Sequence, residues 1–233
     1  MTAPVISVVV PGPAELAEAA AAWTAERITG AVVSRGACYL ALAGGETPRG
    51  CYERLAQPPY QDALPWRSVF VFWSDERQVP LEDPASNYAM AKAALLDHVP
   101  IPPRQIFPLV GDPTPALRQI PSDAAGRPRF DVIHLGLGED GHTASLFPGH
   151  PALREAHALV AAVPDAPKPP PERLTLTLPV INAARAVLFM VQGASKREVL
   201  ARVLRRDPAL PASLVQPVDG ELQFIIDRAA AGA

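Results

Sequence analysis

Two patterns of hydrophobic positions alternate along the chain. Short, continuous apolar runs are typical of strands buried on both faces of a sheet, and apolar residues at helical spacing are typical of amphipathic helices. The apolar runs predict strands at residues 6–10, 38–43, 69–73, 132–135, 174–178, 186–191 and 222–226. The helical spacing predicts helices at residues 14–33, 48–55, 87–96 and 195–204. Ser86 or Asn87 is a suitable N-cap for the third of these helices.

This alternation predicts an α/β protein with a doubly wound, mostly parallel, Rossmann-like sheet and helices on both faces. We find no internal repeat and no domain boundary, so we expect one domain over residues 1–233. In such sheets, ligands bind beyond the carboxyl ends of the strands. Polar or glycine-rich segments follow four predicted strands, at residues 44–48, 74–77, 136–142 and 193–196. We therefore expect these four segments to form one site.

Composition narrows the class of protein. Of the 233 residues, 48% are hydrophobic and 19% charged, which is typical of a globular domain. The net charge of −3 gives no reason to expect nucleic acid as a partner, and no apolar run is long enough for a membrane span. The N-terminus lacks the basic region of a signal peptide. Cys38 and Cys51 are then expected to be reduced thiols of a cytoplasmic protein.

The segment after the second predicted strand contains Gly44, Gly45, Glu46, Thr47 and Pro48. Two glycines allow a tight turn, and proline suits the first position of a helix. The free N–H groups at a helix start can bind an anion, and the Thr47 hydroxyl can assist. A plain turn between strand and helix explains the same residues. Under the phosphate interpretation, the Glu46 carboxylate must point away from the anion.

Three charged residues, Asp75, Glu76 and Arg77, follow the strand at residues 69–73. We expect them to lie outside the core. They can form a solvated loop with a local salt bridge, or Arg77 can hold a phosphate or carboxylate with its planar guanidinium.

Residues 136–149 contain the pattern G-x-G-x-x-G after a strand, which is the dinucleotide-binding fingerprint, and Asp165 follows about 20 residues later. However, Pro148 and Pro151 interrupt the helix that a crossover between parallel strands requires. The dinucleotide interpretation is therefore rejected, and a rigid glycine turn at the rim of the sheet remains.

This turn presents Asp140 and His142. A histidine beside a carboxylate can act as a general base, and we expect Asp140 to raise its pKa by favouring the imidazolium form. A lone histidine is more often structural, but a polar strand end between glycines is not a core environment. We favour a functional role for His142.

The fourth segment places Lys196 in the first turn of a predicted helix that starts at Ser195. A cation there opposes the helix dipole unless it serves a bound anion, although a solvated surface lysine is equally compatible. The chain has only two other lysines, Lys92 and Lys168. The histidines and cysteines show no spacing typical of a metal site, and no G-x-S-x-G nucleophile elbow occurs.

Six segments carry a resemblance to a known family, and these are residues 44–48, 75–77, 86–88, 136–149, 173–179 and 193–196. Taken in order, they closely resemble the 6-phosphogluconolactonases, which share a fold with glucosamine-6-phosphate deaminases and ribose-5-phosphate isomerases. Residues 138–148 are the most specific of these. In the deaminases a catalytic carboxylate follows the equivalent of His142, and residues 143–148 contain none. Those relatives also tend to carry an aromatic residue at the position of Arg77. Both differences favour the lactonase.

The resemblance implies hydrolysis of 6-phospho-D-glucono-1,5-lactone to 6-phosphogluconate in the pentose phosphate pathway, without metal or cofactor. His142 would be the general base that activates water, and Asp75 and Asp140 would support it or handle protons. The implied phosphate-binding residues are Gly44, Gly45, Thr47, Arg77, Arg173 and Lys196.

The chain departs from the family pattern at Glu46, where a smaller or polar residue is usual, and at residues 112–129, where relatives have a fuller helix. An alternative enzyme is a deaminase or isomerase acting on an amino sugar phosphate. A non-catalytic sugar-phosphate sensor is the other alternative, but no basic helix-turn-helix region accompanies the domain. The expected partner is a small sugar-phosphate lactone, and the expected assembly is a monomer or weak homodimer.

Overall fold

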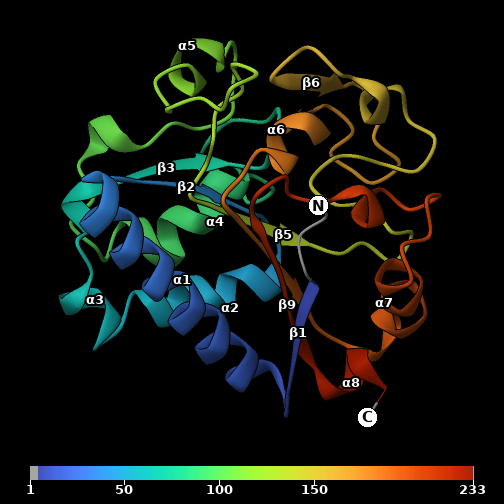
Figure 1. Ribbon diagram of the computed structural model, residues 1–233, viewed down its shortest axis with the longest axis horizontal. Helices are drawn as coiled ribbons and strands as arrows, with labels where there is room; N and C mark the ends of the chain where they lie inside the picture. Colours follow the sequence, from blue (N-terminus) through green and yellow to red (C-terminus); the bar gives the residue numbers. More distant parts are fainter. Residues whose placement is uncertain (1–4, 233) are drawn as a thin grey trace.

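The computed structural model describes residues 5–232, and its centre is a six-stranded parallel sheet (Figure 1). Its strands are β1 (Val5–Val10), β2 (Cys38–Leu42), β3 (Val69–Trp73), β5 (Val132–Gly136), β8 (Ala186–Val191) and β9 (Glu221–Asp227), in the order β1-β9-β8-β5-β2-β3. The predicted α/β fold with a mostly parallel sheet is confirmed. The connections change direction around β2, which pairs with β3 on one side and β5 on the other. Such a switch point is where α/β sheets bind ligands.

A second sheet differs from the prediction. Its three antiparallel strands are β4 (Asp75–Arg77), β7 (Arg173–Leu176) and β6 (Val160–Val163), in the order β4-β7-β6. The strand predicted at residues 174–178 is β7, so its placement in the parallel sheet was wrong. The segment at residues 74–77, predicted as a loop, contains β4, and β6 was not predicted. Strands of three or four residues are too short to give a clear hydrophobic period.

Helices pack around the sheets. In Figure 1, α1 and α2 lie on one side of the parallel sheet, and α5, α6 and the strand β6 lie on the other. The α-helices are α1 (Pro13–Arg35), α2 (Glu46–Leu55), α3 (Tyr60–Ala63), α4 (Asn87–Ala91), α5 (Thr114–Leu117), α6 (Leu178–Asn182), α7 (Arg197–Leu204) and α8 (Arg228–Ala231). Shorter helical turns are Trp66–Ser68, Lys92–Leu96, Pro103–Gln105, Pro151–Arg154, Ala194–Lys196 and Pro211–Leu214.

Helix boundaries follow local capping. The Ser86 side chain accepts a hydrogen bond from the N–H of Ala89, so Ser86 is the N-cap of α4. The helix then continues as a π-helical turn, Lys92–Leu96. The predicted helix at residues 195–204 is a 3₁₀ turn, Ala194–Lys196, followed by α7 from Arg197. Within residues 112–129 the helix is only the four residues of α5, in line with the prolines there.

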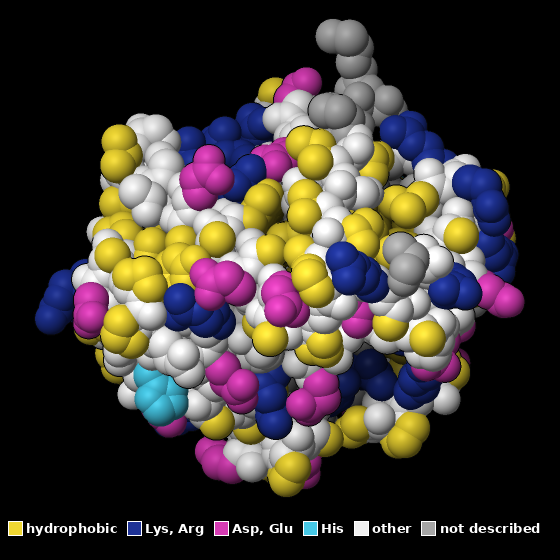
Figure 2. All heavy atoms as spheres, turned by 90° about the horizontal axis from the view of Figure 1, so that it is seen from below, with side chains coloured by type: hydrophobic (Ala, Val, Ile, Leu, Met, Phe, Trp, Pro, Cys, Tyr) yellow, Lys and Arg dark blue, Asp and Glu magenta, His cyan; other side chains and the backbone are white. Residues whose placement is uncertain are grey.

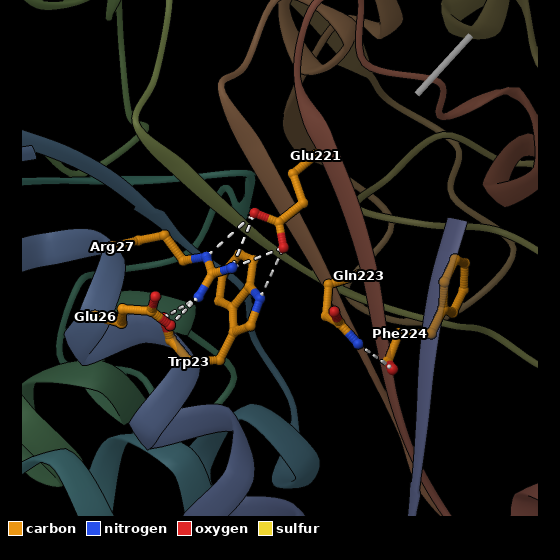
Figure 3. Close-up of polar contacts among 6 residues, drawn as sticks. All are labelled: Trp23, Glu26, Arg27, Glu221, Gln223 and Phe224. Atoms are coloured by element: carbon orange, nitrogen blue, oxygen red, sulfur yellow. Dashed lines mark hydrogen bonds and ion pairs between the residues drawn. The ribbon is translucent and has the colours of Figure 1, made fainter. Parts of the chain in front are cut away.

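The long helix α1 is fixed to the start of β9 by a polar cluster (Figure 3). The Arg27 guanidinium binds both carboxylate oxygens of Glu221, at 2.7 and 2.9 Å from Nη2. It also lies over the Trp23 ring, 4.1 Å from the ring centroid, and the indole N–H donates to Glu221 at 3.3 Å. The bidentate pair and the cation–π contact together orient α1 across the sheet.

The molecular surface carries both signs of charge. On the face in Figure 2, Lys and Arg side chains are interspersed with Asp and Glu side chains around scattered hydrophobic ones. Among residues 5–232, none of the helices has the length and apolar character that crossing a membrane would need.

His134 of β5 is a fully buried titratable side chain between α1 and α2. Its Nε2 lies 2.9 Å from Oγ1 of Thr24, its ring stacks on Tyr52, and burial lowers its pKa to about 3. The unfolded chain therefore binds a proton below about pH 6.5 that the folded chain excludes, so stability falls on acidification. We expect His134 to contribute about 2 kcal/mol of lost stability between pH 7 and pH 5.

The measurement is the free energy of unfolding by urea at both pH values, in the parent and in His134→Gln. The variant should lose this part of the pH dependence, whatever its overall stability. An unchanged difference between the two pH values would show that His134 titrates normally in the folded protein.

Candidate active site

A cavity of about 340 Å³ lies at the carboxyl ends of β2, β3, β5 and β8. The structure brings eight of the nine predicted site residues to its wall, and these are Gly44, Gly45, Thr47, Asp75, Arg77, His142, Arg173 and Lys196. Asp140 does not line the cavity, but its carboxylate contacts Nδ1 of His142. Four segments far apart in the sequence therefore share one cleft.

The start of α2 forms one wall of the cleft. Gly45 is the N-cap, with a φ of 100° that favours glycine, and the helix begins at Glu46. Pro48 is therefore the third helical residue, and its predicted place at the first position was wrong. A Cβ on Gly44 would lie 1.9 Å from Oδ1 of Asn87, so only glycine allows this close approach. The first N–H groups of α2 and its dipole give this wall a positive potential.

Glu46 does not disturb that wall. Its side chain is 82% exposed, and its Oε2 lies 3.5 Å from Nη1 of Arg49, one turn further along α2. The carboxylate charge is thus held at the surface beside a cation, which is compatible with an anion at the start of the helix.

The glycine turn after β5 shapes the opposite wall. The N–H of Gly138 donates to the carbonyl of His142 at 2.8 Å, and Gly141 adopts a φ of 85°. A Cβ on Gly138 would lie 2.0 Å from Nδ1 of His142 and 2.6 Å from Oδ1 of Asp140. The absence of a side chain at Gly138 is what lets the imidazole and the carboxylate meet.

We expect Gly138→Ala to displace both groups and to lower kcat by roughly tenfold, because small displacements of catalytic groups are costly. Gly30 of α1 provides the matched control, since it is exposed, does not line the cleft, and a Cβ there meets no atom within 4 Å. Steady-state kinetics of both alanine variants tests this. Equal kcat values in the two variants would show that the position of His142 does not depend on Gly138.

His142 is paired and largely buried. Its Nδ1 lies 2.5 Å from Oδ1 of Asp140, and its ring packs against Phe147 with 4.6 Å between centroids. A carboxylate only accepts, so Nδ1 carries the proton and Nε2 keeps a free lone pair. Burial has the largest effect and lowers the pKa of His142 overall, although Asp140 raises that pKa as expected. The imidazole is therefore neutral at pH 7, as a general base requires.

Two arginines face each other across the β4–β7 pair, where Arg77 is the direct cross-strand partner of Arg173. Arg173 is 5% exposed and donates to the carbonyls of Pro170 and Lys168, at 2.9 and 2.7 Å. Like charges directly opposite each other are destabilising. Burial, together with Arg77, lowers the pKa of Arg173. An anion between the two guanidiniums would relieve this repulsion.

Arg77 has unused hydrogen-bonding capacity. Its Nη1 donates to the carbonyl of Ala85 at 2.6 Å, whereas its buried Nε has no partner among the described residues. Because this Nε is shielded, the outer nitrogens of the guanidinium are the donors that a bound oxyanion in the cleft would meet.

Asp75 and Glu76 correct the expectation that these charged residues lie outside the core, because they are only 6% and 0% exposed. Glu76 accepts from the N–H groups of Arg77, Asn87 and Tyr88, all within 2.8 Å. These donors compensate its burial and fix the turn before α4.

Asp75 connects three parts of the cleft. Its Oδ2 accepts from the Ser145 hydroxyl at 2.6 Å, and its Oδ1 accepts from Nδ2 of Asn87 at 3.3 Å. The Ser145 oxygen in turn lies 3.4 Å from Nη1 of Arg173. Asp75 is thus tied to the loop that carries His142 and to the arginine pair.

The fourth segment contributes Lys196, whose Nζ lies 3.9 Å from Oε1 of Glu139 and whose pKa is lowered by burial. Three further polar residues that line the cleft were missed by the sequence-based prediction, and these are Asn87, Lys168 and Gln192. Lys168 is one of only three lysines in the chain, but it does not follow a predicted strand. Nothing in the sequence pattern singled out Gln192.

Within residues 5–232, no three His, Cys, Asp or Glu side chains gather closely enough to hold a metal ion. The cleft instead combines four cationic side chains, a helix N-terminus and a neutral histidine. This combination suits an anionic substrate and proton transfer to or from it.

Comparison with known proteins supports this description. The chain is 42% identical over 229 residues to 6-phosphogluconolactonase from Synechocystis sp., with 92% of each chain covered. It is 39% identical over 245 residues to the enzyme of that name from Rattus norvegicus, with 98% and 93% covered.

Solved structures agree. The 6-phosphogluconolactonase from Trypanosoma brucei superposes with a TM-score of 0.83, at 30% identity and with 99% of each chain covered. A monomeric glucosamine-6-phosphate deaminase shares the fold, with a TM-score of 0.77 at 22% identity. The family profile of glucosamine-6-phosphate isomerases and 6-phosphogluconolactonases matches residues 11–224. The chain therefore belongs to the glucosamine-6-phosphate isomerase/6-phosphogluconolactonase family.

Proposed function

We propose that this protein is a 6-phosphogluconolactonase, which hydrolyses 6-phospho-D-glucono-1,5-lactone to 6-phosphogluconate in the oxidative pentose phosphate pathway. The observation that carries the proposal is the cleft itself, in which an imidazole held by a carboxylate lies in the same cavity as a paired set of guanidiniums. The named relatives, at about 40% identity over nearly the whole chain, support the same substrate.

The phosphate of the lactone binds between Arg77 and Arg173, with the start of α2 and Lys196 contributing further positive charge. Gly44 and Gly45 allow the close approach of the backbone, and Thr47 adds a hydroxyl donor at the same helix start. The anion neutralises two guanidiniums that otherwise repel each other across the β4–β7 pair.

His142 acts on the lactone carbonyl at the other end of the cleft. Its Nε2 takes a proton from water as the water oxygen attacks C1, which gives a tetrahedral intermediate. The bond between C1 and the ring oxygen then breaks, and the imidazolium returns the proton to that oxygen. Asp140 stabilises the imidazolium and fixes the tautomer, in the way that a carboxylate supports the histidine of a hydrolase triad.

Lys168 adds positive charge to the part of the cleft near His142. It lines the cleft, and it is close enough to His142 to lower the pKa of the imidazole. The same charge favours the oxyanion of the tetrahedral intermediate over the neutral carbonyl. Asp75 holds Ser145 and Asn87 in place by hydrogen bonds.

The test is an assay with freshly prepared lactone, coupled to oxidation of 6-phosphogluconate and corrected for spontaneous opening. A rate proportional to enzyme concentration is expected. A parallel assay with glucosamine 6-phosphate addresses the deaminase alternative, and release of ammonia with no lactone hydrolysis would overturn the proposal. No turnover of either compound would favour a sugar-phosphate sensor.

We further propose that residues 1–233 act as one domain, as a cytoplasmic monomer or weak homodimer. Both cysteines, Cys38 and Cys51, are buried free thiols, which is compatible with a reducing compartment. Light scattering during size-exclusion chromatography at several protein concentrations measures the assembly state.

A further inference from the structure

A second group of charged residues lies at the opposite end of the parallel sheet from the cleft. Arg35 is the last residue of α1, before β2, whereas Asp131 and Arg185 immediately precede β5 and β8. All three therefore lie at the amino ends of parallel strands. Together with Arg129 and Tyr39 they line a separate cavity of about 60 Å³.

The Asp131 carboxylate forms ion pairs with two of these arginines. Oδ1 of Asp131 lies 2.8 Å from Nη2 of Arg35 and 3.3 Å from Nε of Arg185. Its Oδ2 accepts from the backbone N–H of Tyr39 at 2.9 Å. Asp131 is 4% exposed, so its two oxygens are largely committed to these partners.

Two guanidiniums thus contact a single carboxylate, and a third, that of Arg129, lines the same cavity, which leaves an excess of two positive charges there. The ion pair of Arg185 is also incomplete, because its buried Nε makes no hydrogen bond among the described residues. Burial lowers the pKa of Arg185, and Arg129 and Arg35 lower it further. Arg129 uses its Nη2 for the carbonyl of Asp219 and remains at the wall of the cavity.

The backbone holds these side chains in place. The N–H of Arg185 donates to the carbonyl of Phe130 at 2.8 Å, and the N–H of Asp131 donates to that of Tyr39 at 2.9 Å. These bonds join the starts of three neighbouring strands. The sheet therefore fixes the backbone positions from which these partly exposed side chains, Arg35 and Arg185, reach the cavity.

We propose that this cavity, lined by Arg35, Arg129 and Arg185, is a second anion site that binds a phosphate group away from the catalytic cleft. A phosphate oxyanion matches the planar donors of arginine and neutralises the excess charge. The small volume suits inorganic phosphate or the terminal phosphate of a metabolite. Asp131 orients two of the guanidiniums but does not touch the anion.

The experiment separates this site from the cleft by using Arg77→Ala/Lys196→Ala protein, in which the catalytic phosphate site is weakened. Sodium phosphate is titrated by calorimetry at constant ionic strength, and the melting temperature is followed in parallel, because a ligand of the folded state stabilises it. Arg129→Gln and Arg185→Gln are each added to this protein. Arg205→Gln, an exposed arginine at the end of α7, is the control with the same charge change.

We expect one phosphate to bind per chain and to raise the melting temperature, and each cluster substitution to weaken this binding at least tenfold while the control does not. Arg129→Gln leaves the ion pairs of Asp131 with Arg35 and Arg185 intact, so it tests the proposal even if Arg185→Gln fails to fold.

Titration of the parent with 6-phosphogluconate shows which kind of phosphate the site accepts. Two binding events mean that a phosphate ester enters the site, and one means that inorganic phosphate alone fits. Absence of saturable phosphate binding, or binding unchanged by both cluster substitutions, would overturn the proposal.

Discussion

Replacing His142 with asparagine should lower kcat for lactone hydrolysis by about 10²–10⁴-fold, the range that a general base supplies. Asparagine keeps polarity and approximate size, so the loss does not arise from a cavity. Binding of 6-phosphogluconate should persist, because the phosphate-binding side chains come from other segments of the cleft. The measurement is kcat, corrected for spontaneous opening, together with product affinity by calorimetry.

His157→Asn is the matched control, since His157 is an exposed histidine whose side chain does not line the cleft. It should retain the parent's rate. If His142→Asn turns over within a few-fold of the parent, His142 is not the base, and a carboxylate such as Asp75 takes that role.

Arg77→Ala and Lys196→Ala should each weaken 6-phosphogluconate binding by about 1.5–3 kcal/mol, roughly ten- to 150-fold, because each removes a charge-assisted hydrogen bond. The loss at Arg77 has an opposing contribution, since its removal also relieves the repulsion with Arg173 in the free protein. Calorimetric titration of each variant with the product gives both values.

Arg104→Ala removes the same charge from an exposed position outside the cleft and should bind the product as the parent does. Unchanged affinity in both Arg77→Ala and Lys196→Ala would remove the phosphate assignment. A loss in Arg104→Ala as large as theirs would point to long-range charge instead of direct contact.

The parallel sheet could be predicted because its strands are buried on both faces. The runs at residues 69–73 and 186–191 agree with β3 and β8 to the residue, and the alternating helices indicate the layer order. The small antiparallel sheet could not be predicted in the same way. Its strand β4 consists of Asp75, Glu76 and Arg77, whose charge suggests a surface loop. Burial of Glu76 depends on donors about ten residues away, which only the folded chain brings together.

The site was predictable where each residue follows a strand directly, because the carboxyl ends of parallel strands meet at one rim. This placed His142, Arg77 and Lys196 correctly in one cleft. Lys168 reaches the cleft from a proline-rich loop, and Asn87 reaches it only because Gly44 lacks a side chain. The direction of the pKa shift of His142 also required the structure, because it is set by burial against Phe147 and neighbouring groups.

The most direct test of the account is the pH dependence of kcat/KM for lactone hydrolysis in the parent and in Asp140→Asn. Below its pKa, His142 is protonated and cannot act as a base, so the rate should fall on acidification, with a midpoint below about 6.5. Asp140 raises the pKa of His142, so its neutralisation should move that midpoint to still lower pH. The substrate phosphate also titrates near pH 6, but its ionisation does not depend on Asp140. A midpoint that shifts downward in Asp140→Asn is the predicted result, and a rate that does not fall on acidification, or the same midpoint in both proteins, would contradict it.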